Sequence, residues 1–237
     1  MINLLGEPIA RRWSAAAKRE IRDSRVLGTR NLVEGMRSAG PRLRVLVSQS
    51  AVGHYGDRGD ERVDESQPAG DGFLASVTVE WEAEAANADE LGVRVVTTRT
   101  GVVLSPSGGA LEKMLPPFRL GVGGPVAGGR QYMPWIHRED EVRLLLWALD
   151  NRDASETYNA TAPNPVTNRE FSKTLGRVLG RPALVPVPKL ALKLRFGDEL
   201  GEVASGGQRV VPRRALDSGY EFAHPDLEAA LRDLLGR

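Results

Sequence analysis

Short apolar runs alternate with longer stretches of helical spacing over the first hundred residues. The runs at 2–5, 43–47 and 93–99 are rich in Val, Leu and Ile, which is typical of buried strands. The stretches at 14–38 and 73–91 carry apolar residues every three or four positions, which predicts helices. Strands and helices in this order predict right-handed βαβ units and a parallel sheet.

The second half of the chain has a less regular pattern. Glycine and proline are frequent at 105–130, which predicts a long excursion over the sheet. A helix is expected at 140–149 and a short strand at 157–160. Thr-Asn-Arg-Glu is a capping box that opens a further helix at 167–179. An amphipathic helix is expected at 225–235.

Composition and charge exclude several classes of function. The 32 Lys and Arg residues nearly balance the 31 Asp and Glu residues, so nucleic acid is not an expected partner. Cysteine is absent, which excludes disulfides, thiolate metal sites and a cysteine nucleophile, and no metal site is predicted. No apolar run approaches the roughly 20 residues that span a bilayer. We therefore expect a cytoplasmic protein.

The segment at 50–56, Ser-Ala-Val-Gly-His-Tyr-Gly, follows the strand predicted at 43–47. It would lie at the carboxyl end of a parallel strand, which is where ligands bind in such sheets. Two interpretations of Ser50 and of the nearby Ser48 stay open. Ser48 and Ser50 either bind a ligand or only end the strand, because serine is common in turns.

Five motifs spread over nearly the whole chain carry a family resemblance. They are Ile-Asn-Leu-Leu-Gly-Glu-Pro-Ile at 2–9, the segment 50–56, Trp-Glu-Ala-Glu-Ala at 81–85, Trp-Ile-His at 135–137 and Gly-Gln-Arg-Val-Val-Pro at 207–212. Together they resemble extended short-chain dehydrogenase/reductases, and more closely the atypical "epimerase family protein" group. In that group the first motif flanks the cofactor and the second holds the catalytic serine.

This resemblance implies an α/β fold. It would be a Rossmann-type doubly wound parallel sheet lacking its first strands, with a smaller C-terminal α/β substrate lobe. Residues 1–104 would form a partial NAD(P)-binding domain. Residues 105–237 would form mainly the substrate lobe and the C-terminal module, with segments around 130–165 returning to the sheet. The implied cofactor is NADP or NAD, the implied partner is a small-molecule substrate, and a homodimer is compatible with this reading.

The resemblance also implies roles for individual residues. The residue implied as catalytic is Ser50. The residues implied to contact the cofactor are Asn3, Leu5, Gly6, Ser48 and Arg99. The residues implied to contact the substrate are Tyr55, Arg130 and His137.

Three of these assignments have structural alternatives. Arg99 at a strand end either binds phosphate or pairs with an acid, and the ion pair is the more common role. His137, with Arg130 beside it, either clamps an anion, or it is a solvent-facing or hydrogen-bonded histidine next to a packed tryptophan. Glu82 and Glu84 are two positions apart on a helix, so they do not form a carboxylate pair.

The chain departs from the family pattern in two places. The family's glycine-rich strand-turn-helix, which holds the pyrophosphate, would precede the first predicted strand. We expect Met1 to be a miscalled or alternative start, and the short form to bind NADP(H) weakly or not at all. The run at 121–125 is not a substitute, because Pro125 interrupts it and no strand precedes it. Leu74 and Thr78 occupy the positions of the usual catalytic Tyr and Lys.

Three functional hypotheses follow. The first is an NAD(P)-dependent epimerase or oxidoreductase acting on a nucleotide-sugar-like or small carbonyl substrate, with Ser50 orienting the reacting oxygen. The second is a non-catalytic, dinucleotide-responsive binding protein, because the Tyr and Lys are missing. The third is an inactive truncated fragment.

Overall fold

A parallel sheet organises the computed structural model, which describes residues 1–40, 43–203 and 205–237. Its strand order is β1 (Ile2–Asn3), β2 (Val45–Ala51), β4 (Arg94–Thr100) and β8 (Glu156–Ala160). Each neighbouring pair is parallel. The predicted Rossmann-type α/β fold is confirmed, and the segment at 2–5 lies in the same sheet as Ser50.

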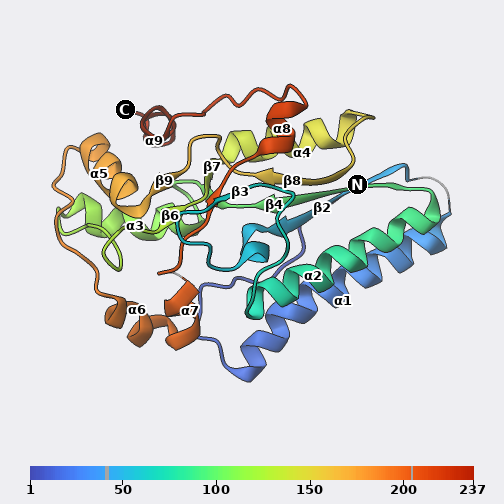
Figure 1. Cartoon of the computed structure of the whole chain (residues 1–237), viewed down its shortest axis with the longest axis horizontal. Helices are drawn as coiled ribbons and strands as arrows, with labels where there is room; N and C mark the ends of the chain where they lie inside the picture. Colours follow the sequence, from blue (N-terminus) through green and yellow to red (C-terminus); the bar gives the residue numbers. More distant parts are fainter. Residues whose placement is uncertain (41–42, 204) are drawn as a thin grey trace.

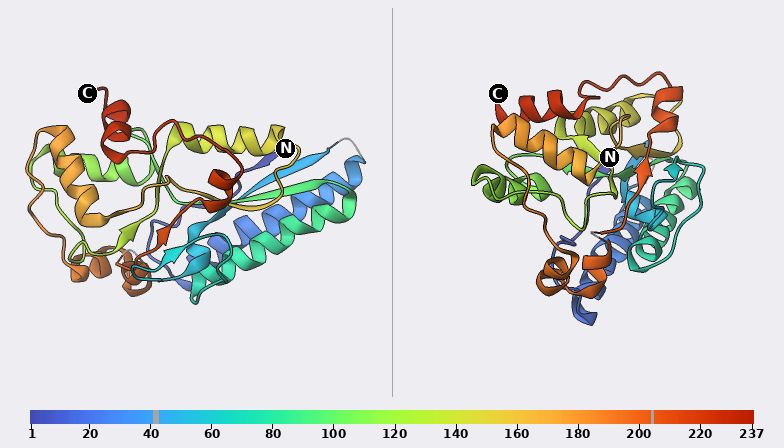
Figure 2. Two further views of the ribbon diagram at one scale, coloured as in Figure 1. Left: turned by 45° about the horizontal axis from the view of Figure 1, so that its top comes forward. Right: turned by 60° about the vertical axis from the view of Figure 1, so that its left-hand side comes forward.

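Helices cover both faces of this sheet (Figure 1). One face carries α1 (Ala15–Ala39) and α2 (Phe73–Ala86), which continues into the 3-10 helix η2 (Asn87–Leu91). The opposite face carries α4 (Arg138–Asp150), drawn in yellow-green in both views of Figure 2. The sheet is therefore the middle of three layers, which is why its strands are apolar on both faces.

Alternate residues of β2 pack into different cores. Leu46 packs with Val33 and Met36 of α1, whereas Val47 packs with Leu144 and Leu145 of α4. Successive side chains of a strand point to opposite faces, so the continuous apolar run serves both cores. This alternation decides which helix each polar side chain near the strand end will meet.

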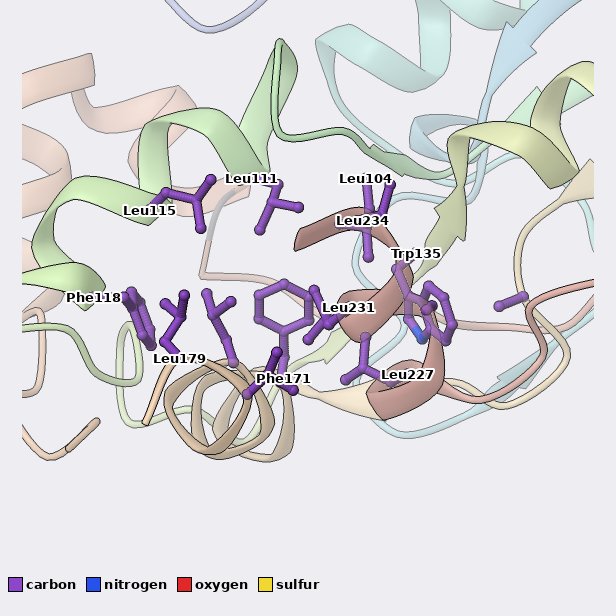
Figure 3. Close-up of a cluster of buried hydrophobic side chains, with 14 residues drawn as sticks. Leu104, Leu111, Leu115, Phe118, Trp135, Phe171, Leu179, Leu227, Leu231 and Leu234 are labelled. Atoms are coloured by element: carbon purple, nitrogen blue, oxygen red, sulfur yellow. The ribbon is translucent and has the colours of Figure 1, made fainter. Parts of the chain in front are cut away.

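A second core lies in the C-terminal lobe (Figure 3). It joins α3 (Gly109–Arg119), α5 (Asn168–Leu179) and α9 (Leu227–Leu235) around the fully buried Trp135 and Phe171. The predicted capping box at Thr167 is present, with Glu170 bonding back to the Thr167 N–H. Short strand pairs complete the lobe: β5 (Val102–Leu104) with β7 (Trp135–His137), and β6 (Tyr132–Met133) with β9 (Val166–Thr167).

Some elements differ from the sequence-based expectation. The helix α3 lies inside the predicted Gly- and Pro-rich excursion and includes Pro116 and Pro117. Proline removes a helical N–H, but the carbonyls left free belong to the exposed Glu112 and Lys113 and can bond to water. Leu111, Leu115 and Phe118 bury the other side of α3, and this tertiary packing outweighs the local preference.

The predicted surface loop at 57–72 also contains structure. Its β3 (Arg62–Val63) pairs in parallel with β10 (Arg209–Val210) from the C-terminal module. The other elements of that module are α6 (Lys189–Phe196), α7 (Asp198–Val203) and α8 (Arg213–Asp217). In the described part of the chain, no helix is both long enough and apolar enough to cross a membrane.

Candidate functional site

Strand β2 runs further than predicted, and this places both serines within the sheet. Ser48 and Ser50 were expected in a loop, but β2 extends through Ala51 and only then becomes the 3-10 helix η1 (Val52–Tyr55). Their backbone groups bond to the neighbouring strands, so neither serine ends the strand. Ser50 is opposite Arg99 of β4, and Ser48 is opposite Asn3 of β1.

Glu82 of α2 holds Ser50 and Arg99 together beneath the carboxyl edge of the sheet. Ser50 Oγ donates a hydrogen bond of 2.6 Å to Glu82 Oε1. Arg99 donates from Nε to Oε1 at 2.9 Å and from the second nitrogen, Nη2, to Oε2 at 2.8 Å. Of the two roles considered for Arg99, this bidentate geometry is that of an ion pair with an acid.

Tyr55 extends the cluster across the sheet to β8. Its hydroxyl accepts from Arg99 at 3.1 Å and donates to Asn159 Oδ1 at 2.7 Å. The guanidinium of Arg99 also lies 5.1 Å from the centre of the Tyr55 ring. Gly70 packs against the Tyr55 carbonyl, where a Cβ would come within 2.2 Å of the oxygen, so only glycine fits there.

The charges of this cluster follow from its contacts. Burial alone would raise the pKa of Glu82, but the hydrogen bonds and charge of Arg99 and the Ser50 bond outweigh it, and the pKa is lowered. Burial raises the pKa of Tyr55. Glu82 is therefore ionised and Tyr55 neutral near pH 7, and the single proton of Ser50 points to a carboxylate.

This arrangement changes the chemistry expected of Ser50. A hydroxyl that donates to a carboxylate presents only its lone pairs to a ligand. Ser50 is 2 % exposed, and the lone pairs left on its oxygen can accept a hydrogen bond from a hydroxyl, whereas its proton is not available to a carbonyl.

The positions of the missing Tyr and Lys are filled by packing side chains. Leu74 packs against Gly53: its Cβ lies 3.2 Å from the position that a Cβ on residue 53 would take. Thr78 is buried and donates to the Ala75 carbonyl at 2.8 Å. The nearby His54 Nδ1 lies 3.7 Å from Glu82 Oε1. Burial, and then the charge of Arg99, lower the pKa of His54, so it is neutral near pH 7.

A separate polar network holds the turn that follows β1. Asn3 Nδ2 donates to Thr29 Oγ1 at 2.9 Å and to Ser48 Oγ at 3.1 Å. Asn3 Oδ1 accepts from the Leu5 N–H at 3.1 Å. Asn3 and Ser48 are buried with their partners, whereas Leu5 is 44 % exposed and Gly6 is exposed too. Of these predicted cofactor residues, Leu5 and Gly6 are exposed, with the Arg25 guanidinium packed against Gly6, and Asn3 and Ser48 hold the turn that carries them.

Arg130 and His137 lie outside both networks. Arg130 is exposed, and His137 is 2 % exposed and accepts from the Glu139 N–H at the start of α4. Within the described residues, neither hydrogen-bonds to the Ser50 cluster. Their predicted role as a joint anion clamp stays a prediction.

Comparison with known proteins identifies the family. The model of the NAD dependent epimerase/dehydratase family matches residues 1–161, and that of a domain of unknown function, DUF1731, matches residues 187–234. The chain belongs to the NAD dependent epimerase/dehydratase family. The sequence-based resemblance is thereby confirmed.

Two curated members of this family align along almost the whole chain. The epimerase family protein Mb2239 of Mycobacterium bovis is 44 % identical over 98 % of this chain and 76 % of its own length. The chloroplastic SDR39U1 homolog of Arabidopsis thaliana is 43 % identical over 99 % of this chain and 68 % of its own.

Solved structures agree with the fold. Human epimerase family protein SDR39U1, crystallised with NADPH, has a TM-score of 0.93 and 37 % identity over 100 % of this chain and 81 % of its own. A nucleoside-diphosphate sugar epimerase from Corynebacterium glutamicum has a TM-score of 0.79 and 34 % identity, over 99 % of this chain and 45 % of its own.

Glu82 and Asn159 are the site residues that sequence reasoning missed. Glu82 was considered only as half of a carboxylate pair, and Glu84 indeed bonds elsewhere, to Arg30. The available signal was Arg99 itself. A cation near the end of a buried strand needs an acid from a facing helix, and Glu82 follows the buried Trp81 on α2.

Proposed function

We propose that the chain is an NAD(P)-dependent epimerase or oxidoreductase that acts at a secondary hydroxyl, or the corresponding carbonyl, of a nucleotide-sugar-like or other small substrate. The observation that carries this proposal is the hydrogen bond of 2.6 Å that the Ser50 hydroxyl donates to Glu82 at the carboxyl edge of the sheet. Two relatives support it: one is crystallised with NADPH, and the other is named a nucleoside-diphosphate sugar epimerase.

The residues that fit a dinucleotide lie on the turn after β1. Leu5 and Gly6 present an apolar surface and an exposed backbone, while the buried Asn3 and Ser48 hold that turn in place. When bound there, NAD(P) supplies the site that accepts or donates hydride.

The protein's own groups then act on the reacting oxygen. Ser50 accepts the hydrogen bond of a substrate hydroxyl, because its own proton is held by Glu82. Arg99 fixes Glu82 through two bonds, so the Ser50 oxygen has one orientation. Tyr55 and His54 are both buried, and they exclude water from this cluster.

The test combines binding and hydride transfer. Binding of NADP(H) is measured by calorimetry, and hydride transfer by the nicotinamide absorbance in the presence of a set of UDP- and dTDP-sugars. Ser50→Ala is expected to lower kcat/KM by about 100-fold. Ser38→Ala is the matched control, because the exposed Ser38 hydroxyl donates to the Glu34 carbonyl within its own helix, α1. Equal activity of both variants would contradict the role of Ser50.

A non-catalytic, dinucleotide-responsive protein is the second candidate. The packed Leu74 and the buried Thr78, at the positions of the usual Tyr and Lys, favour it. Calorimetric binding of NADPH without any hydride transfer to or from the sugar set would support this candidate over the first.

A further inference from the structure

Two of the three histidines in the chain meet an aspartate, and none of these three residues belongs to the Ser50 cluster. His137 ends β7, His224 precedes α9, and Asp233 lies on α9. The two imidazole rings stack with centroids 3.7 Å apart and an interplanar angle of 27°. One ligand atom from each of the three residues lies within 4.8 Å of the others.

His137 contributes a buried nitrogen, Nε2, that makes no well-aligned hydrogen bond within the described residues. The residue is 2 % exposed, and its Nε2 has no hydrogen-bond partner within the described residues. Asp233 Oδ2 lies 3.2 Å from Nε2, but the two are not aligned as a hydrogen bond. A buried polar atom left in this way is unfavourable, and it points to a ligand that is bound between the two side chains.

We propose that His137, His224 and Asp233 bind a divalent transition-metal ion of the Zn²⁺ type. Two imidazoles and one carboxylate are a ligand set that such ions prefer. With metal–ligand bonds of about 2.0–2.1 Å, two ligands of a tetrahedral ion lie about 3.3 Å apart. The 3.2 Å between His137 Nε2 and Asp233 Oδ2 matches that spacing.

The surroundings hold two of the ligands in place. The Asp140 carboxylate accepts from the Ala223 N–H at 2.7 Å and from the His224 N–H at 2.9 Å, which fixes the backbone that carries His224. Glu139 Oε2 lies 3.4 Å from His224 Nε2 and can orient that ring. Asp233 is 57 % exposed on its helix, so its side chain can move toward the ion.

Metal binding requires two local changes. The Glu139 N–H donates to His137 Nδ1 at 3.1 Å, so the ring proton lies on Nε2 without metal. Binding at Nε2 moves that proton to Nδ1 and ends this capping bond, which is weaker than a metal–ligand bond. The stacked rings must also rotate so that their lone pairs converge. The bound ion then links α9 to the junction of β7 and α4.

The test uses untagged, full-length chain that has been stripped with a chelator. It is titrated with Co²⁺ in the spectrophotometer and with Zn²⁺ in the calorimeter. We expect one ion per chain, visible Co²⁺ bands of a low-coordinate site and a Kd on the order of micromolar or tighter. The absence of cysteine means that thiolate cannot account for the signal. Failure to bind either ion would overturn the proposal.

Variants assign the ligands. Asp233→Asn and His224→Asn are expected to weaken binding at least about tenfold, whereas Asp217→Asn, on the exposed α8, leaves it unchanged. Thermal unfolding checks that the variant folds, because without metal Asp233→Asn should have the same Tm as the parent. Added Zn²⁺ should raise the Tm of the parent but not that of Asp233→Asn. Equal Zn²⁺ affinity in parent and Asp233→Asn would show that the ion binds elsewhere.

Discussion

On the two faces of strand β4, two largely buried acids have pKa values that are shifted in opposite directions. On the α2 face, Glu82 receives two hydrogen bonds from Arg99 and one from Ser50. On the α4 face, Glu141 receives a bond of 2.9 Å from Thr100, and its Oε2 has no partner within the described residues. Arg99 and Thr100 are adjacent, so one step along the strand changes the face and the available partner.

The difference shows that a neighbouring cation, acting against burial, decides in which direction the pKa of each acid shifts. Both carboxylates are removed from water, which favours the neutral form. Arg99 reverses this for Glu82, whose pKa is lowered. Glu141 has no such cation, and burial raises its pKa to about 7 even though the Thr100 bond opposes the shift.

Replacing Arg99 removes the cation that lowers the pKa of Glu82, and we expect this change to have the largest effect on stability. Arg99→Met leaves Glu82 buried without its charged partner, which we expect to destabilise the fold by about 3–5 kcal/mol. Denaturant unfolding at neutral pH measures this. The matched control is Arg213→Met, because Arg213 and its partner Asp217 are 62 % and 65 % exposed, and this pair should contribute much less to stability. Equal losses in the two variants would refute the distinction.

Glu141→Gln should act in the opposite direction and depend on pH. The folded-state pKa of about 7 lies above the ordinary value of 4.5, so folding holds the proton more tightly and ionisation costs stability as pH rises from 4.5 through 7. Glutamine removes that cost. Above pH 7 we expect it to stabilise the protein by on the order of 3 kcal/mol.

The pH dependence is itself the control for that variant. Below pH 4 Glu141 of the parent is protonated and therefore neutral, as glutamine is. Parent and Glu141→Gln should then unfold at similar denaturant concentrations. A gain in stability that is the same at every pH would mean that ionisation of Glu141 is not its cause.

Much of the sheet could be predicted from sequence, because the strands carry their own signal. The apolar runs around Ile2, Val47 and Val96 are bounded by turns and separated by helices, which is enough to expect a parallel sheet. The fold class follows from this local information. The position of Ser50 within the sheet does not, because β2 extends through Ala51, beyond the predicted apolar run, and only the structure shows that Ser50 pairs with Arg99.

The partners of these residues could not be predicted in the same way. Glu82 meets Ser50 only because α2 presents that side to the sheet, and Asn159 meets Tyr55 across the width of the sheet. His224 and Asp233 reach His137 through the packing of α9 on Trp135. These contacts depend on the rotation and placement of whole helices, which periodicity does not specify.

The smallest of the expected stability effects tests how far the charged cluster depends on Tyr55. Tyr55→Phe keeps the ring under the Arg99 guanidinium but removes the hydroxyl between Arg99 and Asn159. Asn159 Oδ1 then loses its donor, and we expect a loss of about 1–3 kcal/mol in denaturant unfolding. Tyr132→Phe is the control, since Tyr132 is only half-buried. Glu82 keeps both bonds from Arg99 in this variant, so the pH dependence of unfolding should not change. A loss of stability that appears only at acid pH would show that Tyr55 also helps to hold the Arg99–Glu82 ion pair.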